Sequence, residues 1–573
     1  MDSLVREEVE SAMFHRKTAL LLLLAIVLVA LAVRYPLVEH ERFQTDSYFI
    51  HSLSNDIVRE GRAAWTFNAL SYVGYYPSSY PSGVPFVLAE LSLLTGLGVD
   101  VCILLTDGVL AALFCLVVFC LSREFVHRVE FALLAAFLAV IAPRFVDTTY
   151  WVGSARGMDI VLITLLVFAT FRAGSSRNNR LLVISVLIGF GCFAVHHMAV
   201  LIILYGIGFV LAELTRRYLP RAFRNRGERL AITTAASFGV IATIVVLNYF
   251  EILGNSFTTF GETGFFDFKI PVATLLGNLI VSYAHQIGLV LAVAALGVVA
   301  FLRAPRFFVR SIFPFALLLV FVPVLGSSLY VSMLLSPFVA IVGVLWFQSP
   351  RGQKKTRIGK STTMIAILIV FSLTFTVWSV DRWNQSVQPS GDTVQVGNEV
   401  FNDATYLRWN GDGLYTMTNT PLGGQLGAYS NANFLGSGIQ AAINRDVTKE
   451  EIETNLSSST TPFPGNLYTW LVYKDDSFVN IYVLVLMTNG VGVIRGADEA
   501  SKFHVYATSH SNVLIVVDNN WPSEYTTAYA IEKAPFLVEV KNGQTYGSPP
   551  ANIESYCSYE SQRVTIYMVQ LPL

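Results

Sequence analysis

The sequence predicts a polytopic α-helical membrane protein of about 11 spans with a C-terminal, β-rich α+β domain outside the membrane. Of the 573 residues, 53% are hydrophobic and only 14% are charged, which is roughly half the charged fraction of a soluble globular chain. The apolar residues gather in runs that approach the ~20 residues a helix needs to cross a bilayer. The charge also changes sign, from a balance of +7 in residues 1–381 to −8 in 382–573.

Eleven apolar runs are predicted to be transmembrane helices. They are residues 18–33, 99–121, 129–143, 159–173, 181–197, 199–214, 230–250, 280–302, 311–326, 329–347 and 362–380. One further run, 83–97, is ambiguous because it contains Glu90 and is followed by Gly98 and Asp100. This run either crosses the membrane or lies along its surface.

Basic residues between the runs decide the topology, because short loops rich in Lys and Arg stay in the cytoplasm. If 83–97 lies along the outer interface, the five basic segments all fall on one side; they are 123–128, 172–180, 216–229, 303–310 and 351–360. We therefore predict a transmembrane domain, 1–381, in the plasma membrane with a cytoplasmic N-terminus. Its large outer loops are 34–98, 143–158 and 251–279, and residues 382–573 form the extracytoplasmic domain.

The extracytoplasmic domain is predicted to begin with a helix near 402–409 and to continue mainly as strands. Asn489-Gly490 and Asn542-Gly543 indicate hairpin turns, because both dipeptides tolerate positive φ. The segment has no nucleophile elbow, metal-binding pair or phosphate-binding loop, so we expect a lid or recognition domain without chemistry of its own. Neither half of the chain is basic enough to predict nucleic-acid binding. Four of the five cysteines lie in apolar runs, so no disulfide framework is expected.

Asp46 is the first candidate for chemistry. It follows the first span in Gln44-Thr45-Asp46-Ser47-Tyr48-Phe49, ahead of a helix-like stretch that ends at Gly61. An acid at such a junction can hold a divalent cation or take a proton from an acceptor hydroxyl. The alternative is an ordinary helix N-cap, in which Asp46 only satisfies free backbone amides.

The second outer loop contains two arginines and two acids. Arg144 and Arg156 can pair with phosphate, or they can anchor to lipid headgroups. Asp147 and Asp159 can complete a cation site with Asp46. The residue types and their spacing do not decide between phosphate binding and lipid anchoring for the two arginines.

Polar residues within spans usually face the bundle interior, because exposure to lipid is costly. Asp107 is expected to point inward for this reason. His196 and His197 are adjacent in the sequence, so at most one of them can face a ligand from a regular helix. We assign His196 to the same phosphate that Arg144 and Arg156 can bind. The alternative is a hydrogen bond between helices.

Together these segments resemble oligosaccharyltransferase catalytic subunits and, more broadly, the GT-C superfamily of polyprenyl-phosphate-dependent glycosyltransferases, which includes the protein O-mannosyltransferases. The resemblance rests on Asp46-Ser47-Tyr48-Phe49, the Tyr- and Pro-rich stretch 75–83, the run 84–121 with Asp100, the segment 143–159, and Ala404 to Asn410 at the start of the external domain. It covers 34–175 well, 381–440 weakly, and the rest only in architecture.

The resemblance implies site residues and a cofactor. Asp46 inherits the role of the first-loop acid that binds a metal, here Mg²⁺ or Mn²⁺, and helps to activate the acceptor. Glu262, in the third outer loop, is the candidate acceptor-contacting acid. The family's second acidic motif follows a Gly-Ser step, but here Gly153-Ser154 is followed by Ala155-Arg156-Gly157. Either Asp159 replaces those metal ligands, or Arg156 neutralises the phosphate directly.

The implied function is an inverting glycosyltransferase that moves a sugar from a polyprenyl-phosphate-linked donor to a glycan or protein acceptor at the external membrane face. Membrane lipid is a further partner. The alternatives are an oligosaccharyltransferase-like protein glycosylation enzyme, or a transporter or scaffold without enzymatic activity. The Trp-Trp-Asp-Tyr-Gly motif of oligosaccharyltransferases is absent from residues 415–423, which argues against asparagine as the acceptor. The chain has no internal repeat of the kind that many transporters show.

Overall fold

The computed structural model describes most of the chain up to residue 222 and parts of the remainder. The described residues are 2–37, 40–41, 45–61, 83–176, 179–196, 199, 201–222, 283–303, 309, 311–321, 328–348, 358–384, 396–410, 415–417, 422–430, 433–435, 512–518, 539–541, 544–546, 554–562 and 564–570. The chain forms two compact units. Met1–Pro36 and Leu105–Trp383 make the first unit, and Leu37–Leu104 and Asn384–Leu573 make the second.

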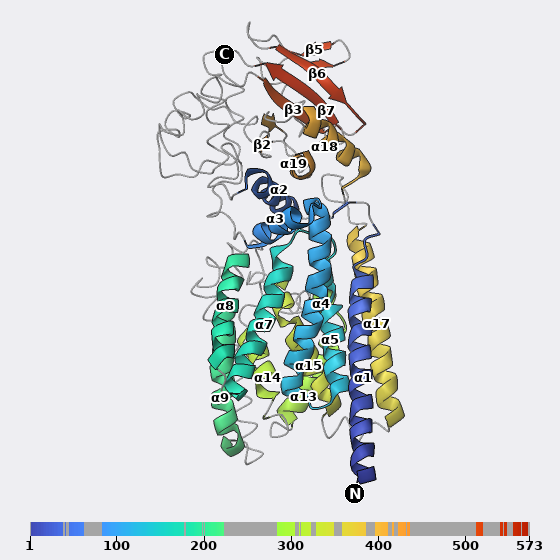
Figure 1. The fold of residues 1–573 in the computed structure, drawn as a ribbon, viewed down its shortest axis with the longest axis vertical. Coiled ribbons are helices and arrows are strands. Elements are labelled where there is room, and N and C mark those ends of the chain that lie inside the picture. The colour runs from blue at the N-terminus through green and yellow to red at the C-terminus, as the bar shows by residue number, and fades with distance from the viewer. Residues whose placement is uncertain are drawn as a thin grey trace, which may run out of the picture. The chain divides into compact units, whose positions relative to one another are not determined.

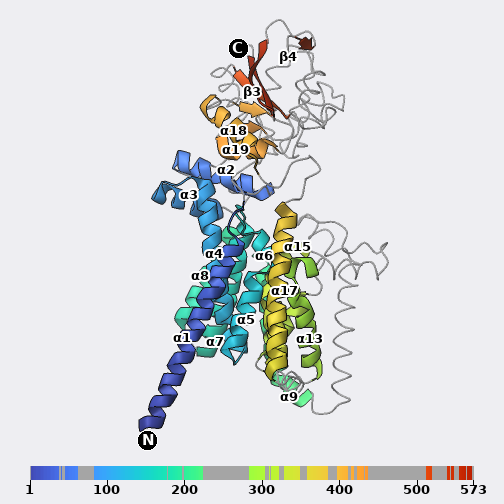
Figure 2. The same ribbon diagram turned by 90° about the vertical axis from the view of Figure 1, so that its right-hand side faces the viewer.

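The first unit is a bundle of apolar helices that run side by side (Figures 1 and 2). Its helices are α1 (Asp2–Val33), α4 (Val99–Phe125, which begins in the second unit), α5 (Val129–Val140), α6 (Pro143–Asp147), α7 (Ala155–Ser176), α8 (Asn179–Val195), α9 (Ile202–Ala222), α13 (Val290–Arg303), α14 (Ile312–Phe321), α15 (Ser328–Gln348) and α17 (Ile358–Asn384). Every run predicted to span the membrane contains a helix, except 230–250, which lies outside the described residues.

Four of the described helices are both long and apolar enough to cross a membrane. These segments are Val99–Phe125, Ala155–Gly174, Val331–Gln348 and Thr363–Arg382. Other apolar helices, such as Lys17–Val33 and Asn179–Val195, are shorter. The mostly helical, apolar architecture is therefore as predicted, while the total of 11 spans stays a prediction.

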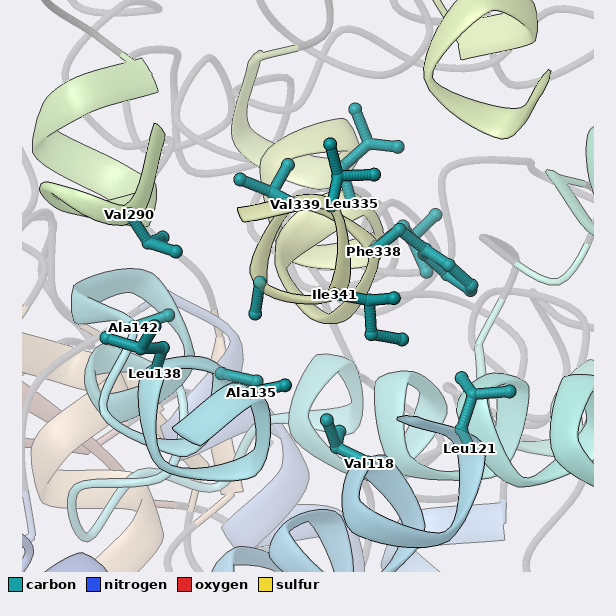
Figure 3. Packing of buried hydrophobic residues seen from close by; sticks show 14 of the residues in the cluster. Val118, Leu121, Ala135, Leu138, Ala142, Val290, Leu335, Phe338, Val339 and Ile341 are labelled. Carbon is teal, nitrogen blue, oxygen red and sulfur yellow. The ribbon is translucent and has the colours of Figure 1, made fainter. Parts of the chain in front are cut away.

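The core of the bundle surrounds α15. Leu335, Phe338, Val339 and Ile341 of this helix are fully or almost fully buried, and Figure 3 places them among side chains of α4, α5 and α13. The backbones of α13 and α15 approach so closely that a Cβ at Gly297 would overlap the Val342 carbonyl oxygen. Only glycine permits this approach.

The second unit combines residues Leu37–Leu104 with the C-terminal segment. Its helices are α2 (Thr45–Glu60), α3 (Gly83–Thr95), α18 (Asn398–Asn410) and α19 (Leu422–Ser430). Helix α2 packs against α3 and α19, and α19 packs against α18. The predicted helix near 402–409 corresponds to α18. The predicted domain limits, 1–381 and 382–573, follow the order of the sequence, whereas the compact units are discontinuous.

The C-terminal segment contains a five-stranded sheet in the order β2-β1-β3-β7-β6. The strands are β1 (Tyr415–Met417), β2 (Asn433–Leu435), β3 (Asn512–Asp518), β6 (Glu554–Glu560) and β7 (Val564–Gln570). β1 is parallel to β2 and β3, while β7 is antiparallel to β3 and β6. The alternating residues Val564 and Ile566 of β7 are buried against α18 and α19, because successive side chains of a strand point to opposite faces.

A separate hairpin joins β4 (Glu539–Lys541) to β5 (Gln544–Tyr546), with Lys541 opposite Gln544. This pairing confirms the hairpin predicted from Asn542-Gly543. The other turn signal, Asn489-Gly490, lies outside the described residues, as does most of 382–573. The β-rich class of the whole domain therefore stays a prediction.

Helix α3 has apolar side chains on its exposed face as well as on its buried face, which includes Val84, Leu88 and Ala89. Phe86, Val87 and Leu93 are exposed, and Leu94 is 85% exposed. A helix that is apolar on its exposed face is suited to contact with lipid. The placement of 83–97 along the interface stays a prediction.

Candidate functional site

The segment between α6 and α7, residues 148–154, is packed rigidly within the first unit. Thr148, Thr149, Tyr150 and Val152 are at most 1% exposed. Trp151 has φ of 51°, a left-handed conformation that a bulky side chain rarely adopts. Such strain persists only where the surroundings fix the backbone, and it is frequent at functional sites.

Asp107 of α4 fixes this segment from one side. Its side chain is buried, and its Oδ2 accepts a hydrogen bond of 2.9 Å from the backbone N–H of Val152. The expectation that Asp107 points inward is therefore confirmed. The bond pairs a backbone donor directly beside the strained Trp151, so Asp107 helps to hold the loop in one conformation.

Arg34, at the end of α1, fixes the same segment from another side. Its Nε donates to Thr149 Oγ1 at 2.7 Å, and its Nη2 and Nη1 donate to the carbonyl oxygens of Val140 and Ala30, both at 3.0 Å. Asp107 supplies a favourable charge nearby. Sequence reasoning gave Arg34 no role. A charged residue that directly follows an apolar run indicates either a contact with lipid headgroups or a buried residue that hydrogen-bonds to neighbouring segments.

Arg144 lies at the start of α6 and forms an ion pair within the loop. Its Nη1 lies 2.6 Å from Asp147 Oδ2, and both side chains are largely buried. The pair compensates the charge of Arg144 with that of Asp147. One carboxylate oxygen of Asp147 is thereby engaged with Arg144, and its part in a cation site stays a prediction.

Arg156 and Asp159 lie in the first turns of α7, three residues apart and so on neighbouring positions of one helix face. Arg156 is half-buried, whereas Asp159 is fully buried. Neither carboxylate oxygen of Asp159 has a hydrogen-bond partner among the described residues. A buried carboxylate in this condition is costly, which makes Asp159 the clearest candidate ligand for a cation or a donor group.

The start of α7 packs directly on the strained loop. A Cβ at Gly157 would lie 2.8 Å from Thr149 Cγ2 and 3.2 Å from the Thr148 carbonyl oxygen. Glycine at this position therefore lets the helix approach the loop closely. The loop and the helix that carries Arg156 and Asp159 form one packed structure.

His196 directly follows α8 and is buried. Its backbone N–H donates to the Cys192 carbonyl oxygen at 3.0 Å, which continues the helical pattern. Cys192 of α8 and Tyr205 of α9 lie close enough to Asp159 to be affected by its charge. His196 and Asp159 both lie in the first unit, but the role of His196 as a phosphate ligand stays a prediction.

Asp46 is the second residue of α2, in the second unit. The helix begins at Thr45, so Asp46 lies in the first turn rather than at the preceding cap position. An acid in the first turn is stabilised by the helix dipole, by about 0.3–1 kcal/mol. Only the backbone position of Asp46 is described.

A buried polar cluster surrounds the first turn of α2. Glu41 is fully buried; its Oε2 lies 2.8 Å from His51 Nδ1, and its Oε1 accepts a hydrogen bond of 3.3 Å from Ser47 Oγ. The ring of Tyr429, from α19, meets the His51 ring edge-on at 5.1 Å. Burial, and then the charge of Glu41, hold the pKa of Tyr429 well above its usual value. Sequence reasoning gave this cluster no role.

The candidate residues are thus divided between the units. Arg144, Arg156, Asp159 and His196 lie in the first unit and Asp46 in the second, while Glu262 lies outside the described part of the chain. Among the described residues, no group of three His, Cys, Asp or Glu side chains is arranged to hold a metal ion. The metal site predicted from Asp46 and Asp159 stays a prediction.

Comparison with solved structures finds membrane transferases. The archaeal oligosaccharyltransferase AglB from Archaeoglobus fulgidus, in complex with an inhibitory peptide and a dolichol-phosphate, aligns at 13% identity with a TM-score of 0.53, covering 91% of this chain and 72% of that one. The oligosaccharyltransferase of the same organism with Zn and sulfate aligns at 12% identity with a TM-score of 0.52, covering 86% and 67%.

ArnT from Cupriavidus metallidurans, bound to undecaprenyl phosphate, aligns at 14% identity with a TM-score of 0.45 and covers 96% of this chain and 97% of that one. No protein-family model and no curated protein sequence matches the chain. Identities this low show the fold alone. The protein has the GT-C-like fold of membrane glycosyltransferases.

Proposed function

We propose that the protein is a glycosyltransferase that moves a sugar from a polyprenyl-phosphate-linked donor to an acceptor at the external membrane face. One observation carries the proposal. In a GT-C-like fold, the helix start that follows the second outer loop presents a half-buried arginine, Arg156, and a fully buried carboxylate, Asp159, without a partner among the described residues. In a protein that binds no ligand there, an apolar side chain in place of that carboxylate would make the folded state more stable.

The reaction is a single displacement with inversion at the anomeric carbon. The acceptor oxygen or nitrogen forms a bond to that carbon as the carbon–oxygen bond to the phosphate breaks, and the electron pair leaves with the phosphate. Asp46 orients the acceptor and takes its proton. Glu262 is the second acceptor-contacting acid in this proposal.

The leaving phosphate needs positive charge close to its oxygens. Arg144 is paired with Asp147 at 2.6 Å, so its charge is already compensated. We assign the larger role to Arg156, because it lies half-buried at the start of α7, one turn before Asp159, with Arg144 and His196 as supporting groups. A divalent cation, Mg²⁺ or Mn²⁺, would supply further neutralisation when bound, and Asp159 and Asp46 have the carboxylate oxygens that such cations prefer.

The acceptor is a glycan or a protein group other than the asparagine of a sequon. The region that would carry the sequon-reading motif contains β1 (Tyr415–Met417) and the first residues of α19, and its sequence lacks that motif. Because function depends on the site and not on the fold, likeness to oligosaccharyltransferases does not extend to their acceptor.

Donor binding tests the proposal in the purified full-length protein. We expect Arg156→Gln to weaken the binding of a radiolabelled polyprenyl phosphate at least tenfold, because a charge-assisted phosphate contact is lost. Arg172→Gln is the matched control. Arg172 lies at the other end of α7, about 24 Å away by helix rise, and pairs with Glu124 at 3.4 Å in an exposed position.

The control should bind like the wild type. If both variants bind polyprenyl phosphate as the wild type does, Arg156 is a lipid anchor and the proposed donor site is wrong. If the wild-type protein binds the lipid but transfers no sugar from any polyprenyl-phosphate-linked donor, the scaffold alternative replaces the enzyme.

A further inference from the structure

The buried cluster around Glu41 has an arrangement that simple packing does not require. Glu41 precedes α2 in the sequence, yet its carboxylate reaches two side chains of that helix, Ser47 at 3.3 Å and His51 at 2.8 Å. Ser47 and His51 are one and five residues after Asp46. Both oxygens of Glu41 are therefore used to hold the helix turns that contain Asp46.

His51 is in turn held by the C-terminal segment. Its ring packs edge-on against Tyr429 of α19 at 5.1 Å, and Tyr429 packs against Phe401 of α18 at 5.4 Å. His40, next to Glu41, stacks on Phe401 at 4.3 Å and lies 3.0 Å from Asn398 Oδ1 through its Nε2. The contacts form one connected set within the second unit.

The polar character of Glu41 and His51 indicates that they fix the position of the helix turn and do not serve stability alone. The Glu41 side chain is fully buried, and that of His51 is 4% exposed. Buried ion pairs are often no more stabilising than apolar side chains of similar volume, but they fix geometry through hydrogen bonds. The side chains that hold the first turn of α2 are thus polar where apolar packing would serve stability equally well.

We propose that Glu41 and His51 are positioning residues that fix the first turn of α2 and thereby set the location of Asp46 for sugar transfer. This inference rests on the proposed function of Asp46. It gives α18 and α19 a role in the reaction, because they hold His51 in place. A displacement of a reacting group by about 1 Å can lower a rate a hundredfold, so the effect is large enough to measure.

The closest test compares two substitutions of His51. Both His51→Ala and His51→Asn remove the ring that packs on Tyr429, but only the asparagine amide can still donate to Glu41 from a position like that of Nδ1. We expect His51→Ala to lower kcat for sugar transfer at least tenfold with little change in the KM for the donor. His51→Asn should retain kcat within about threefold of the wild type.

Hydrogen exchange of the backbone amides of residues 45–50 supplies a readout that does not depend on activity. Exchange should be faster in His51→Ala and in Glu41→Gln than in His51→Asn. Arg59→Gln is the control, because Arg59 pairs with Asp56 at 2.6 Å in the last turns of the same helix, more than three turns beyond Asp46. It should leave kcat and the exchange of 45–50 unchanged, even if the melting temperature falls.

Equal kcat values for His51→Ala and His51→Asn, or unchanged exchange in Glu41→Gln, would overturn the positioning role. Asp46→Asn, assayed alongside, separates this failure from failure of the proposed function. If Asp46→Asn is inactive while His51→Ala and Glu41→Gln are fully active, only the positioning role is wrong. If Asp46→Asn is active, the role of Asp46 is wrong.

Discussion

Asp159→Asn is the substitution that best separates a functional from a structural carboxylate in the first unit. The wild-type side chain is fully buried, and neither of its oxygens has a hydrogen-bond partner among the described residues. The substitution keeps the size of the side chain and removes its ability to ionise. Because the asparagine amide is also polar and unpaired, we expect Asp159→Asn to change the free energy of unfolding by less than about 1 kcal/mol.

Asp107→Asn is the matched control, because Asp107 is also buried in the bundle but is fully engaged. Its Oδ2 accepts the Val152 N–H at 2.9 Å, and its charge stabilises that of Arg34. Removing this charge should lower stability by about 1–3 kcal/mol, since a hydrogen bond to a charged group contributes that much. The two substitutions are chemically identical, but only Asp107→Asn is expected to lower stability by this amount.

The assay is denaturant unfolding of the purified protein in detergent micelles, with and without polyprenyl phosphate and Mn²⁺. Ligands that bind only the folded state stabilise it. They should therefore stabilise the wild type and Asp107→Asn, but not Asp159→Asn, which should also lose sugar transfer. If Asp159→Asn is as unstable as Asp107→Asn, Asp159 is an ordinary structural residue and the reasoning is refuted.

Three further predictions concern packing, topology and pH. Gly157→Ala should destabilise the protein by about 1–3 kcal/mol because its Cβ would lie 2.8 Å from Thr149, whereas Gly189→Ala, with open space around it, should be neutral or stabilising by up to about 1 kcal/mol; denaturant unfolding compares them. A nitroxide attached to Leu94→Cys should be shielded from a water-soluble relaxation agent in liposomes, because we predict that α3 lies against lipid, and full exposure to the agent would contradict this prediction. Partial burial, and then its hydrogen bond to Asp403, raise the pKa of Tyr559 to about 12, so the stabilisation that this phenol contributes is complete below pH 10 and is lost as pH rises through about 12. The stability difference between the wild type and Tyr559→Phe should disappear over that range, and a difference that persists unchanged above it would show that the shift is absent.

The helices of the bundle were predictable because their signal is local. A run of apolar residues such as 99–121 or 329–347 has no stable alternative to a helix in a lipid bilayer, where every backbone polar group must be satisfied internally. The hairpin at Asn542-Gly543 was predictable for a similar reason, since its turn needs particular residues at two adjacent positions. The limits of such local signals appear in the predicted run 280–302, where helical residues 283–287 are interrupted at Gly288, with φ of 86°, before α13 begins at Val290.

The contacts that fix the candidate site were not predictable because they join distant residues. Arg34 donates hydrogen bonds to Thr149 and Val140 across more than a hundred residues of sequence. No periodic pattern in the sequence predicts such a contact. The set that links Glu41 and His51 to Tyr429 is of the same kind. By contrast, Asp46, Arg156 and Asp159 were found by their position beside apolar runs and by resemblance, which identify residue types but not their partners.

Sugar transfer by Asp46→Asn protein is the measurement that tests the central claim most directly. Wild-type protein, Asp46→Asn and Asp46→Ala are reconstituted in liposomes with a radiolabelled polyprenyl-phosphate-linked sugar, and transfer and donor binding are measured separately. We expect Asp46→Asn to abolish transfer while leaving folding and donor binding intact, because loss of a first-turn acid costs only about 0.3–1 kcal/mol of stability. Transfer at the wild-type rate by folded Asp46→Asn protein would contradict the account, because Asp46 would then serve only the helix.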